Sequence, residues 1–272
     1  MNPADFDYVR DFVCEQAAIV LEPGKEYLVE SRLQSLARKE NLGSLDELIG
    51  NLRSDPKNGL HRKVLDAMTT NETLFFRDVH PFEALRKSIL PELMARRAQE
   101  RQLRFWCGAA STGQEPYSVL MLIAEHFPEL LEWDFTFIAT DLCIEVLARA
   151  RSGRFNQLEV NRGLPAGLLV KYFARQGAEW EFCEDLRRRV EFRELNLVKD
   201  WPWLPPLDIV FLRNVLIYFD VRAKKDILAN TRRLLRPGGY LLLGGAETTF
   251  NLDEAFERVT FDKTSCYRVR QA

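Results

Sequence analysis

Small and polar residues follow several hydrophobic segments of this 272-residue sequence, and each segment has the composition of a β-strand. They are Gly108-Ala-Ala-Ser-Thr-Gly113 after residues 103–107, Asp141 after 134–139, Asn196-Leu197 after 190–195, and Arg213-Asn214 after 207–212. In an open parallel sheet, ligands bind in the crevice outside the carboxyl ends of the strands. These residues therefore predict one ligand site along the strand ends.

The loop Gly108–Gly113 has the residues that a close approach of backbone to ligand requires, because its side chains are small. A helix expected from Pro116 to about Phe127 begins just after it, and a helix N-terminus can hold an anion such as a carboxylate. The loop matches neither G-x-x-x-x-G-K-[ST] nor G-x-G-x-x-G, which argues against the usual nucleotide fingerprints. A small-residue turn with a purely structural role remains the alternative.

The polar residues at the other strand ends each allow two interpretations. Asp141 could grip a ribose diol at the tip of the second strand, or it could cap the following helix. Asn196 and Leu197 could read an adenine ring through an amide and backbone groups. Arg213 faces either solvent or a ligand, and Asn214 is equally suited to a turn.

The pattern of apolar residues predicts which elements position this site. Strands are expected at residues 103–107, 134–139, 207–212 and 240–243, and helices at 116–127, 144–151 and 221–235. This alternation predicts an α/β fold with a mostly parallel sheet and helices on both faces. Residues 153–190 interrupt it as a small inserted subdomain, and residues 256–270 are expected to form an antiparallel hairpin.

The N-terminal part, residues 1–73, has helical patterns only. Helices are expected around residues 6–13, from Lys25 to Glu40, after the capping box Ser44-Leu-Asp-Glu47, and over 60–68. A further helix begins near Pro81 and is expected to end near Pro91. The sequence thus predicts a helical domain at 1–73 and a second domain at 74–272.

Composition narrows the function classes. With 46% hydrophobic and 29% charged residues and a net charge of −2, the chain is typical of a globular protein and unlike a broad nucleic-acid binder. The five scattered cysteines and three histidines predict free, buried thiols and no metal site. No signal peptide and no apolar run of about 18 residues is found, so we expect a cytoplasmic protein without membrane insertion.

Four motifs occur in an order that closely resembles the chemotaxis protein methyltransferases, the CheR family. They are Asn71-Glu-Thr73-Leu-Phe-Phe-Arg77, Ala109-Ala-Ser-Thr-Gly-Gln-Glu115-Pro-Tyr-Ser118, Ala139-Thr-Asp141 and Arg213-Asn214-Val-Leu-Ile-Tyr218-Phe. The resemblance runs from the helical N-terminus nearly to the end of the chain. It implies a class I methyltransferase (Rossmann-like) fold.

The resemblance also implies a cofactor and a substrate. S-adenosylmethionine, which leaves as S-adenosylhomocysteine, would be bound by Asn71, Thr73, Arg77, Glu115, Asp141, Asn196, Leu197, Arg213 and Asn214. The substrate would be glutamate side chains on the cytoplasmic helices of chemoreceptors, which become γ-methyl esters during chemotactic adaptation. The chain would then be a protein-glutamate O-methyltransferase of signal transduction that needs no metal.

Two places depart from the family pattern. Gly244-Gly-Ala-Glu247 stands where the family has Gly-His-Ser-Glu, so no role of that His or Ser is carried over. The insertion between Tyr172 and Phe192 is short compared with enzymes that dock on a receptor's C-terminal pentapeptide. Tethering of that kind is not expected here.

A glutamate carboxylate is already ionised at neutral pH and can attack a sulfonium methyl, so the reaction needs in-line placement and desolvation rather than a general base. Arg77 is expected to orient the glutamate or the cofactor carboxylate through paired hydrogen bonds. Tyr218 either lines the position of methyl transfer or packs with the apolar run Val215–Phe219. These two residues are the catalytic candidates.

The helix at 25–40 is the candidate for receptor docking. It bears Lys25, Arg32 and Lys39 at seven-residue spacing, close to one face, with Arg38 nearby. Such a face could meet acidic receptor helices, although a solvated surface is the ordinary interpretation and nearby glutamates dilute its charge. We expect reversal of Arg32 and Arg38 to glutamate to weaken receptor methylation and to spare cofactor affinity.

Two other functions use the same residues. A small-molecule or nucleic-acid methyltransferase would keep the cofactor and change the substrate, although the charge and the lack of an Asn-Pro-Pro-Tyr-like motif count against nucleic acid. A sensor that binds the cofactor without catalysis is compatible with intact Arg77, Glu115 and Asp141. The chain is expected to be a monomer.

Overall fold

The computed structural model describes residues 1–22, 24–54, 59–261 and 263–270. The chain divides into two compact units, which are taken in turn below. The smaller unit comprises residues 1–70 with 218–223, and the larger comprises residues 71–217 with 224–272. The strand-end residues singled out in the sequence all lie in the larger unit.

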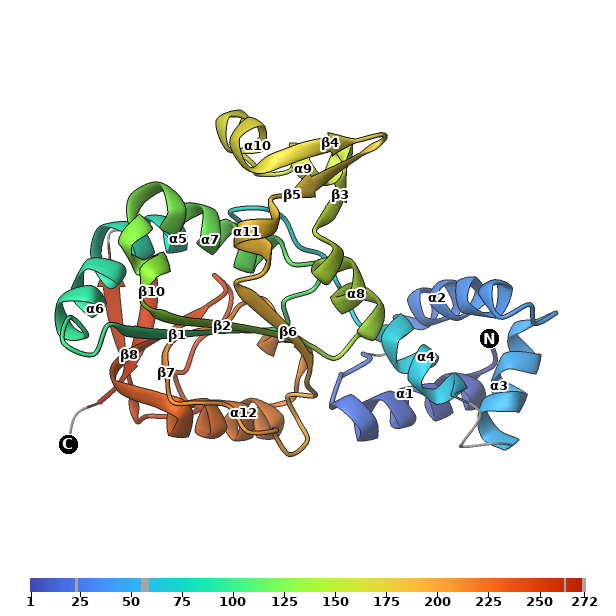
Figure 1. Cartoon of the computed structure of the whole chain (residues 1–272). Coiled ribbons are helices and arrows are strands. Elements are labelled where there is room, and N and C mark those ends of the chain that lie inside the picture. The colour runs from blue at the N-terminus through green and yellow to red at the C-terminus, as the bar shows by residue number, and fades with distance from the viewer. Residues whose placement is uncertain (23, 55–58, 262, 271–272) are drawn as a thin grey trace. The chain divides into compact units, whose positions relative to one another are not determined.

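A seven-stranded sheet forms the centre of the larger unit (Figure 1), in the order β6-β2-β1-β7-β8-β10-β9. Its strands are β1 Gln102–Gly108, β2 Asp134–Asp141, β6 Val190–Glu194, β7 Leu207–Leu212, β8 Leu235–Leu243, β9 Phe256–Phe261 and β10 Thr264–Val269. The first five in the spatial order pair in parallel, and β10 pairs antiparallel with both β8 and β9. The predicted parallel sheet with a C-terminal antiparallel hairpin is confirmed.

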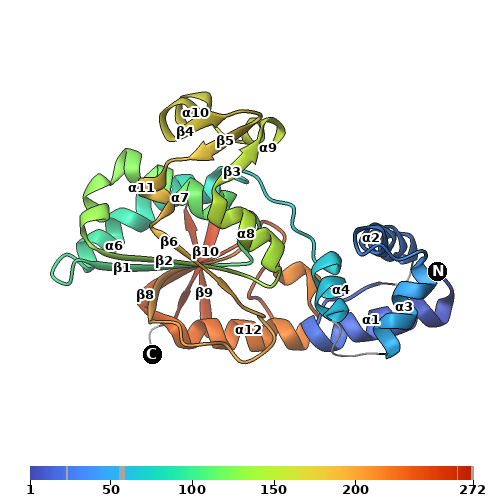
Figure 2. The same cartoon turned by 45° about the vertical axis from the view of Figure 1, so that its right-hand side comes forward.

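Helices cover both faces of this sheet, with α7 on one face and α12 on the other (Figures 1 and 2). The helical elements around the sheet are α5 His80–Ala84, η1 Leu85–Ile89, α6 Leu90–Arg96, α7 Gln114–His126, η2 Pro128–Glu132, α8 Ile144–Ser152, η3 Leu216–Tyr218 and α12 Val221–Leu234. The helix expected to end near Pro91 instead continues to Arg96. It does so through the π-helical turn η1, because a wider turn accommodates a proline that lacks an N–H and would collide with the carbonyl before it.

Polar residues occur only in the first half of the two central strands, as Gln102 and Arg104 in β1 and Asp208 in β7. Every residue of β7 is buried, and so are Phe105, Trp106 and Cys107 of β1. A parallel strand covered by helices on both faces meets no solvent, so it has no polar alternation. Beyond Arg104 and Asp208, both strands are apolar up to their ends, which is why the polar residues that follow them stand out in the sequence.

The insertion after α8 forms a three-stranded antiparallel sheet in the order β3-β5-β4. Its elements are β3 Arg154–Asn156, α9 Gln157–Asn161, α10 Ala166–Tyr172, β4 Phe173–Gln176, β5 Glu179–Phe182 and α11 Glu184–Arg187. Buried Phe155, Phe173 and Phe182 form its inner side, and Tyr117 of α7 packs against Phe155 and Phe182 with ring centroids 6.1 and 4.5 Å apart. Aromatic packing therefore joins the subdomain to the sheet layer.

The smaller unit is helical, as expected, with α1 Pro3–Ala17, α2 Glu26–Lys39, α3 Leu45–Ser54 and α4 Leu60–Met68. Its core consists of side chains at helical spacing, among them Val9, Val13, Val29, Leu33, Leu48, Leu52 and Val64. The Ser44 hydroxyl accepts a hydrogen bond from the Glu47 N–H at 3.1 Å, as a capping residue does, while the Glu47 carboxylate accepts from Gly43 N–H.

Two expectations about the surface have different outcomes. The cysteines are free, but the expectation that all are buried was wrong, since Cys14 is exposed and Cys183 only half-buried. Cys14 lies on the solvent-facing side of α1, so its thiol is not part of the hydrophobic core. Within the described ranges, no helix is both long and apolar enough to cross a membrane.

Candidate active site

We term one edge of the parallel sheet the strand-end rim. It consists of the carboxyl ends of β6, β2, β1, β7 and β8 and the loops that follow them. Strand β1 lies between β2 and β7, so the chain leaves β1 in one direction along the sheet and later returns on its other side. This is the switch point at which open α/β sheets form their ligand crevice. Glu115, Asp141, Asn196, Leu197, Arg213 and Asn214 lie along this rim, and the backbone carbonyls of Asn71 and Arg77 are hydrogen-bonded to it.

The loop after β1 is shaped by close packing against the next strand. A Cβ atom added at Gly108 would lie 2.5 Å from Leu212 Cδ2 of β7, so a larger residue would displace the loop. Ala109 and Ser111 adopt φ values of 63° and 51°, which only small or locally bonded residues tolerate well. Close packing and these dihedral angles thus fix the course of the loop at the end of β1, where Ala109 is half-buried and residues 110–113 are buried.

Asp141, at the end of β2, ties three segments together. Its carboxylate accepts hydrogen bonds from Ser111 N–H at 2.8 Å and from Cys143 N–H at 2.9 Å. The Ser111 hydroxyl in turn donates to the Asn71 carbonyl at 2.7 Å, and Leu195 N–H donates to the Asp141 carbonyl at 3.0 Å. The N-cap of α8 is Cys143 rather than Asp141, so Asp141 organises the loops beside the helix.

The loop after β6 places Asn196 and Leu197 at the outer end of the rim. The Asn196 side-chain oxygen accepts from Val198 N–H at 3.1 Å, and Leu197 is buried. The Trp201 indole donates to the Leu197 carbonyl at 3.0 Å and packs edge-on against Trp106 of β1. These contacts hold an amide and an apolar side chain beside the end of β2.

Arg213, directly after β7, is the most enclosed charge of the rim, with its side chain 1% exposed. It forms an ion pair with Glu115 at the start of α7, and its second Nη donates to the Asp78 carboxylate at 2.7 Å and to the Arg77 carbonyl at 2.9 Å. Its buried Nε has no hydrogen-bond partner in the described part of the chain. The Arg213 side chain is thus enclosed by protein rather than exposed to solvent. It links the start of α7 to the segment at 77–78.

The charges in this cluster stabilise one another. Burial by itself lowers the pKa of the Arg213 guanidinium, but the neighbouring Glu115 carboxylate, together with Asp78, raises it above its ordinary value. Burial and the Glu115 charge raise the pKa of the Cys107 thiol well above its usual range. Cys107 is therefore protonated and donates to Glu115 at 3.3 Å, so it is no nucleophile.

The segment that carries Arg77 is strained. Phe76, Asp78 and Val79 have φ values of 48°, 68° and 45°, and such residues typically cost about 1–3 kcal/mol each. Hydrogen bonds hold it, since Phe76 N–H donates to the Ser118 hydroxyl at 2.9 Å and Arg213 grips Asp78. The half-buried Arg77 donates to the Glu72 carbonyl at 3.0 Å, so its guanidinium is bent back over the motif that begins at Asn71.

Glu247, in the loop after β8, is a site residue that the sequence reasoning missed. Its carboxylate accepts backbone hydrogen bonds from Gly244, Asn214, Val215 and Leu216 at 2.6–2.8 Å, and from Ile217 at 3.3 Å. Asn214 reaches this position with a φ of 57°, so it is a turn residue as well as a rim residue. The sequence signal that could have identified Glu247 is its retention in Gly244-Gly-Ala-Glu247. In the structure its carboxylate joins the ends of β7 and β8.

The remaining candidates lie in the smaller unit. Tyr218 ends η3, where its carbonyl accepts from Val20 N–H at 3.0 Å. Arg32 donates to the Met68 carbonyl at 2.7 Å and to the Thr70 hydroxyl at 3.0 Å. Burial lowers the pKa of Arg32, and Tyr218 opposes that effect. Lys25, which pairs with Glu22 at 3.0 Å, is exposed, as are Arg38 and Lys39.

The residues of the rim suit the cofactor that the sequence resemblance implies. They offer a carboxylate at the β2 tip for a diol, and amides at Asn196 and Asn214 for a base. The buried Arg213 Nε is a donor still to be satisfied. Among the residues with described placement, no three His, Cys, Asp or Glu side chains group so as to hold a metal ion.

Comparison with known proteins identifies the family of this chain. Residues 4–69 match the CheR methyltransferase all-alpha domain, and residues 71–265 match the CheR methyltransferase SAM binding domain. The chain is 40% identical over 270 residues to chemotaxis protein methyltransferase Cher2 of Pseudomonas putida, covering 98% of both chains. It is 42% identical over 272 residues to chemotaxis protein methyltransferase 1 of Pseudomonas aeruginosa, again covering 98% of each, and 38% identical over 263 residues to the Vibrio parahaemolyticus enzyme, covering 95% and 94%. The chain therefore belongs to the CheR family of S-adenosylmethionine-dependent chemotaxis methyltransferases, the protein-glutamate O-methyltransferases.

Proposed function

We propose that this protein methylates glutamate side chains on the cytoplasmic helices of chemoreceptors, with the strand-end rim as its cofactor site. The observation that carries the proposal is the pair of hydrogen-bonded links along the rim. Asp141, Ser111 and Asn71 form one link, and Arg213, Glu115 and Asp78 form the other. They join motifs that are far apart in the sequence into one surface.

The cofactor-binding residues are proposed by motif, and the position of those that lie on the rim or are hydrogen-bonded to it supports the proposal. They are Asn71, Thr73, Arg77, Glu115, Asp141, Asn196, Leu197, Arg213 and Asn214. Asp141 and Asn196 would hold the ribose and adenine side, because they lie at the ends of β2 and β6. Arg213 and Glu115 would set the amino-acid side, because they lie where β1 meets β7. Backbone groups of the Gly108–Gly113 loop lie between these two sides.

The reaction places few demands on acid–base groups. When bound, S-adenosylmethionine supplies an electrophilic methyl group on a sulfonium sulfur. The acceptor carboxylate is ionised at neutral pH, so the chain needs to orient it and to exclude water, which in favourable cases provides about 7–11 kcal/mol. Arg77 is proposed to orient the acceptor through its guanidinium, and Tyr218 to line the transfer position. The product is a neutral ester.

The partner is proposed to be an acidic helical segment of a receptor. Exposed Lys25, Arg38 and Lys39 on α2 carry charge suited to it, and Arg32 supports the end of the same helical unit. We place the enzyme in the cytoplasm, where those receptor helices lie, and as a monomer. Its molecular mass in solution, measured by light scattering, tests the last point.

Transfer of label tests the function directly. The protein is incubated with methyl-labelled S-adenosylmethionine and receptor-rich membranes, and protein-bound label is then treated with mild alkali. We expect alkali-labile label on the receptor, because a methyl ester hydrolyses where an N-methyl group does not. Variants with glutamine at the modified glutamates should lose it.

Two results would contradict the proposal. Label on small molecules in a cell extract, with none on receptors, would indicate another acceptor. Binding of the cofactor by calorimetry without any transfer would indicate a sensor. A variant Asp141→Asn serves as the control for specific labelling, since it removes the carboxylate charge while preserving the shape of the side chain.

A further inference from the structure

Beside the rim, the larger unit has a groove that neither the cofactor nor the docking helix explains. One hollow of about 360 Å³ extends from Asp78 and Gly244 to Lys263 and Tyr267. A second of about 200 Å³ runs from His80 along α5 and η1 to Phe261. Both are lined by His80 and Lys263, so they adjoin there. Together they form what we term the hairpin groove, between the start of α5 and the β9–β10 hairpin.

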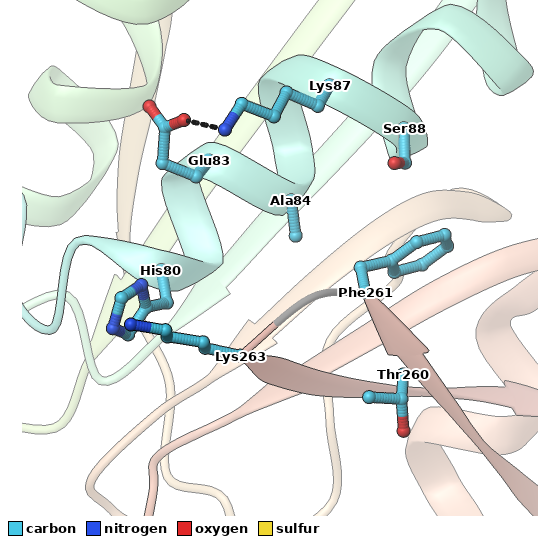
Figure 3. Close-up of a pocket in the computed structure, with 8 residues that line it drawn as sticks. All are labelled: His80, Glu83, Ala84, Lys87, Ser88, Thr260, Phe261 and Lys263. Carbon is cyan, nitrogen blue, oxygen red and sulfur yellow. Dashed lines mark ion pairs between the residues drawn. The ribbon is translucent and has the colours of Figure 1, made fainter.

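The two walls of the groove come from segments far apart in the sequence. Figure 3 shows the His80 and Lys263 side chains lying side by side where the helix and the hairpin approach each other. Further along, the Glu83–Lys87 ion pair lies on the helical wall, while Phe261 projects from the hairpin toward Ser88 (Figure 3). The groove thus combines a charged mouth with an apolar patch, as a surface for an amphipathic segment would.

The acidic side chains that line the groove are already engaged. Asp78 is bound by Arg213 at 2.7 Å, and Glu83 by Arg86 at 2.9 Å and Lys87 at 2.8 Å. The Glu247 carboxylate is occupied by backbone N–H groups. The charge of each carboxylate is therefore compensated by its own partners, and Asp78 and Glu83 remain partly exposed.

Two cations that line the groove are not neutralised in this way. Among the residues whose placement is described, Lys263 and Arg258 form no ion pair, and Arg258 donates only to the neutral Ser265 hydroxyl at 2.7 Å. The described lining consequently presents surplus positive charge. A groove with one sign of uncompensated charge attracts a partner of the opposite sign.

The groove also opens at the place where the acceptor has to arrive. Gly244 lines it and lies against Asn214, because a Cβ at Gly244 would be 2.6 Å from Asn214 Nδ2. Asp78 lines it and binds Arg213. A chain segment in the groove would therefore run past the ends of β7 and β8, beside the rim rather than across its adenine end.

We propose that the hairpin groove binds the acidic receptor segment that flanks the acceptor glutamate, with Lys263 and Arg258 facing its carboxylates. This inference rests on the proposed function and identifies a substrate contact beyond α2. Binding there would hold the acceptor glutamate near Arg213 and Asn214 while its acidic neighbours lie along β9 and β10. The charge pattern favours an acidic peptide over an apolar one.

Single charge reversals with a matched control test the proposal. Lys263→Glu and Arg258→Glu are compared with Lys225→Glu, which makes the same change on exposed α12 outside the groove. For methylation of receptor membranes, we expect each groove variant to raise KM by about threefold to tenfold with little change in kcat. Cofactor affinity by calorimetry should equal that of the wild type, which also shows that each variant is folded.

Salt gives a second readout. The KM of the wild type should rise between low and physiological ionic strength, and that of Lys263→Glu should rise less, because screening acts on the attraction that the variant has lost. A KM for both groove variants equal to that of Lys225→Glu would overturn the groove proposal alone. Absence of alkali-labile label from the wild type would overturn the proposed function and, with it, the groove.

Discussion

The strand-end rim and the basic residues of α2 were predicted from the same sequence, but in the structure their side chains differ in how many contacts they make with distant segments. On the rim, Arg213 and Asp141 each bind several partners from other segments. At α2, the N-cap residue Lys25 pairs with nearby Glu22, and Arg38 is exposed. Arg32 is at the same heptad position as Lys25 but turns to the Met68 carbonyl. Contacts with distant segments thus hold the charged residues at the strand ends in place. On α2, seven-residue spacing alone does not decide which charged side chains remain exposed to a partner.

The largest effect should follow from removing the cation of the rim. Arg213→Ala leaves the largely enclosed Glu115 carboxylate without its ion-pair partner, so we expect a loss of about 3–5 kcal/mol in the free energy of unfolding and no measurable methylation. Urea unfolding and cofactor calorimetry measure both. Arg213→Lys is the control, since it keeps the charge and should retain part of the stability. A variant with wild-type stability would show that the rim is no more interlocked than α2.

A smaller loss should follow from Glu247→Gln. An amide retains an acceptor but lacks the charge that several backbone N–H groups share, so we expect a cost of about 2–3 kcal/mol. The ends of β7 and β8 would also shift, and a displacement near 1 Å can reduce transfer by about 100-fold. Glu254→Gln, at an exposed position of the same loop region, should change neither property. Equal activity of the two variants would refute the positioning role.

Two adjacent glycines offer a sharper comparison within the rim. A Cβ at Gly244 would lie 2.6 Å from Asn214 Nδ2 and 2.7 Å from Glu247 Oε2, whereas one at Gly245 meets nothing within 4 Å. Gly244→Ala should therefore cost about 1–3 kcal/mol and weaken cofactor binding. Gly245→Ala should remain within about 0.5 kcal/mol of the wild type. Thermal unfolding measures the stability of the two variants, and calorimetry measures their cofactor affinity. Similar results for both would contradict the packing argument.

The smallest effect is expected on α2. Arg38→Glu with Lys39→Glu should raise the KM for receptor a few-fold and leave stability and cofactor affinity unchanged, because exposed charges act mainly on association. Arg32→Glu should instead cost about 1–2 kcal/mol in stability, since its bonds to Met68 and Thr70 are lost. Receptor titrations and urea unfolding separate the two outcomes. If Arg32→Glu raised the KM for receptor without lowering stability, Arg32 would instead belong to the docking face.

Several elements could be predicted closely because their signals are local. Strand β7 spans Leu207–Leu212 as expected, since a short apolar run interrupted only by Asp208 and ended by Arg213 is typical of a buried strand in a parallel sheet. The hairpin at 256–270 followed from alternation alone. The continuation of the helix through Pro91 was not predicted, because a π-helical turn leaves no periodic pattern in so short a segment.

The sequence proposed members of the site, but it could not predict the contacts between them. Motif and order identified Asp141, Arg213 and Glu115, but neither indicated that Arg213 would be enclosed by Glu115, Asp78 and the Arg77 carbonyl. Glu247 escaped notice because a single glutamate in a glycine-rich loop is chemically unremarkable until the backbone N–H groups around it are known. The hairpin groove, likewise, joins His80 to Lys263 from opposite parts of the larger unit.

The sequence by itself determined the order of the elements, the family and the chemistry that it brings, because strand periodicity and short motifs are properties of neighbouring residues. The tertiary structure alone decided which of those residues meet. Arg77 and Arg213 are 136 positions apart, yet they are hydrogen-bonded because the segment after Asn71 lies against the end of β7. Parallel strands bring distant loops to a single edge, and that convergence turns separate motifs into one site.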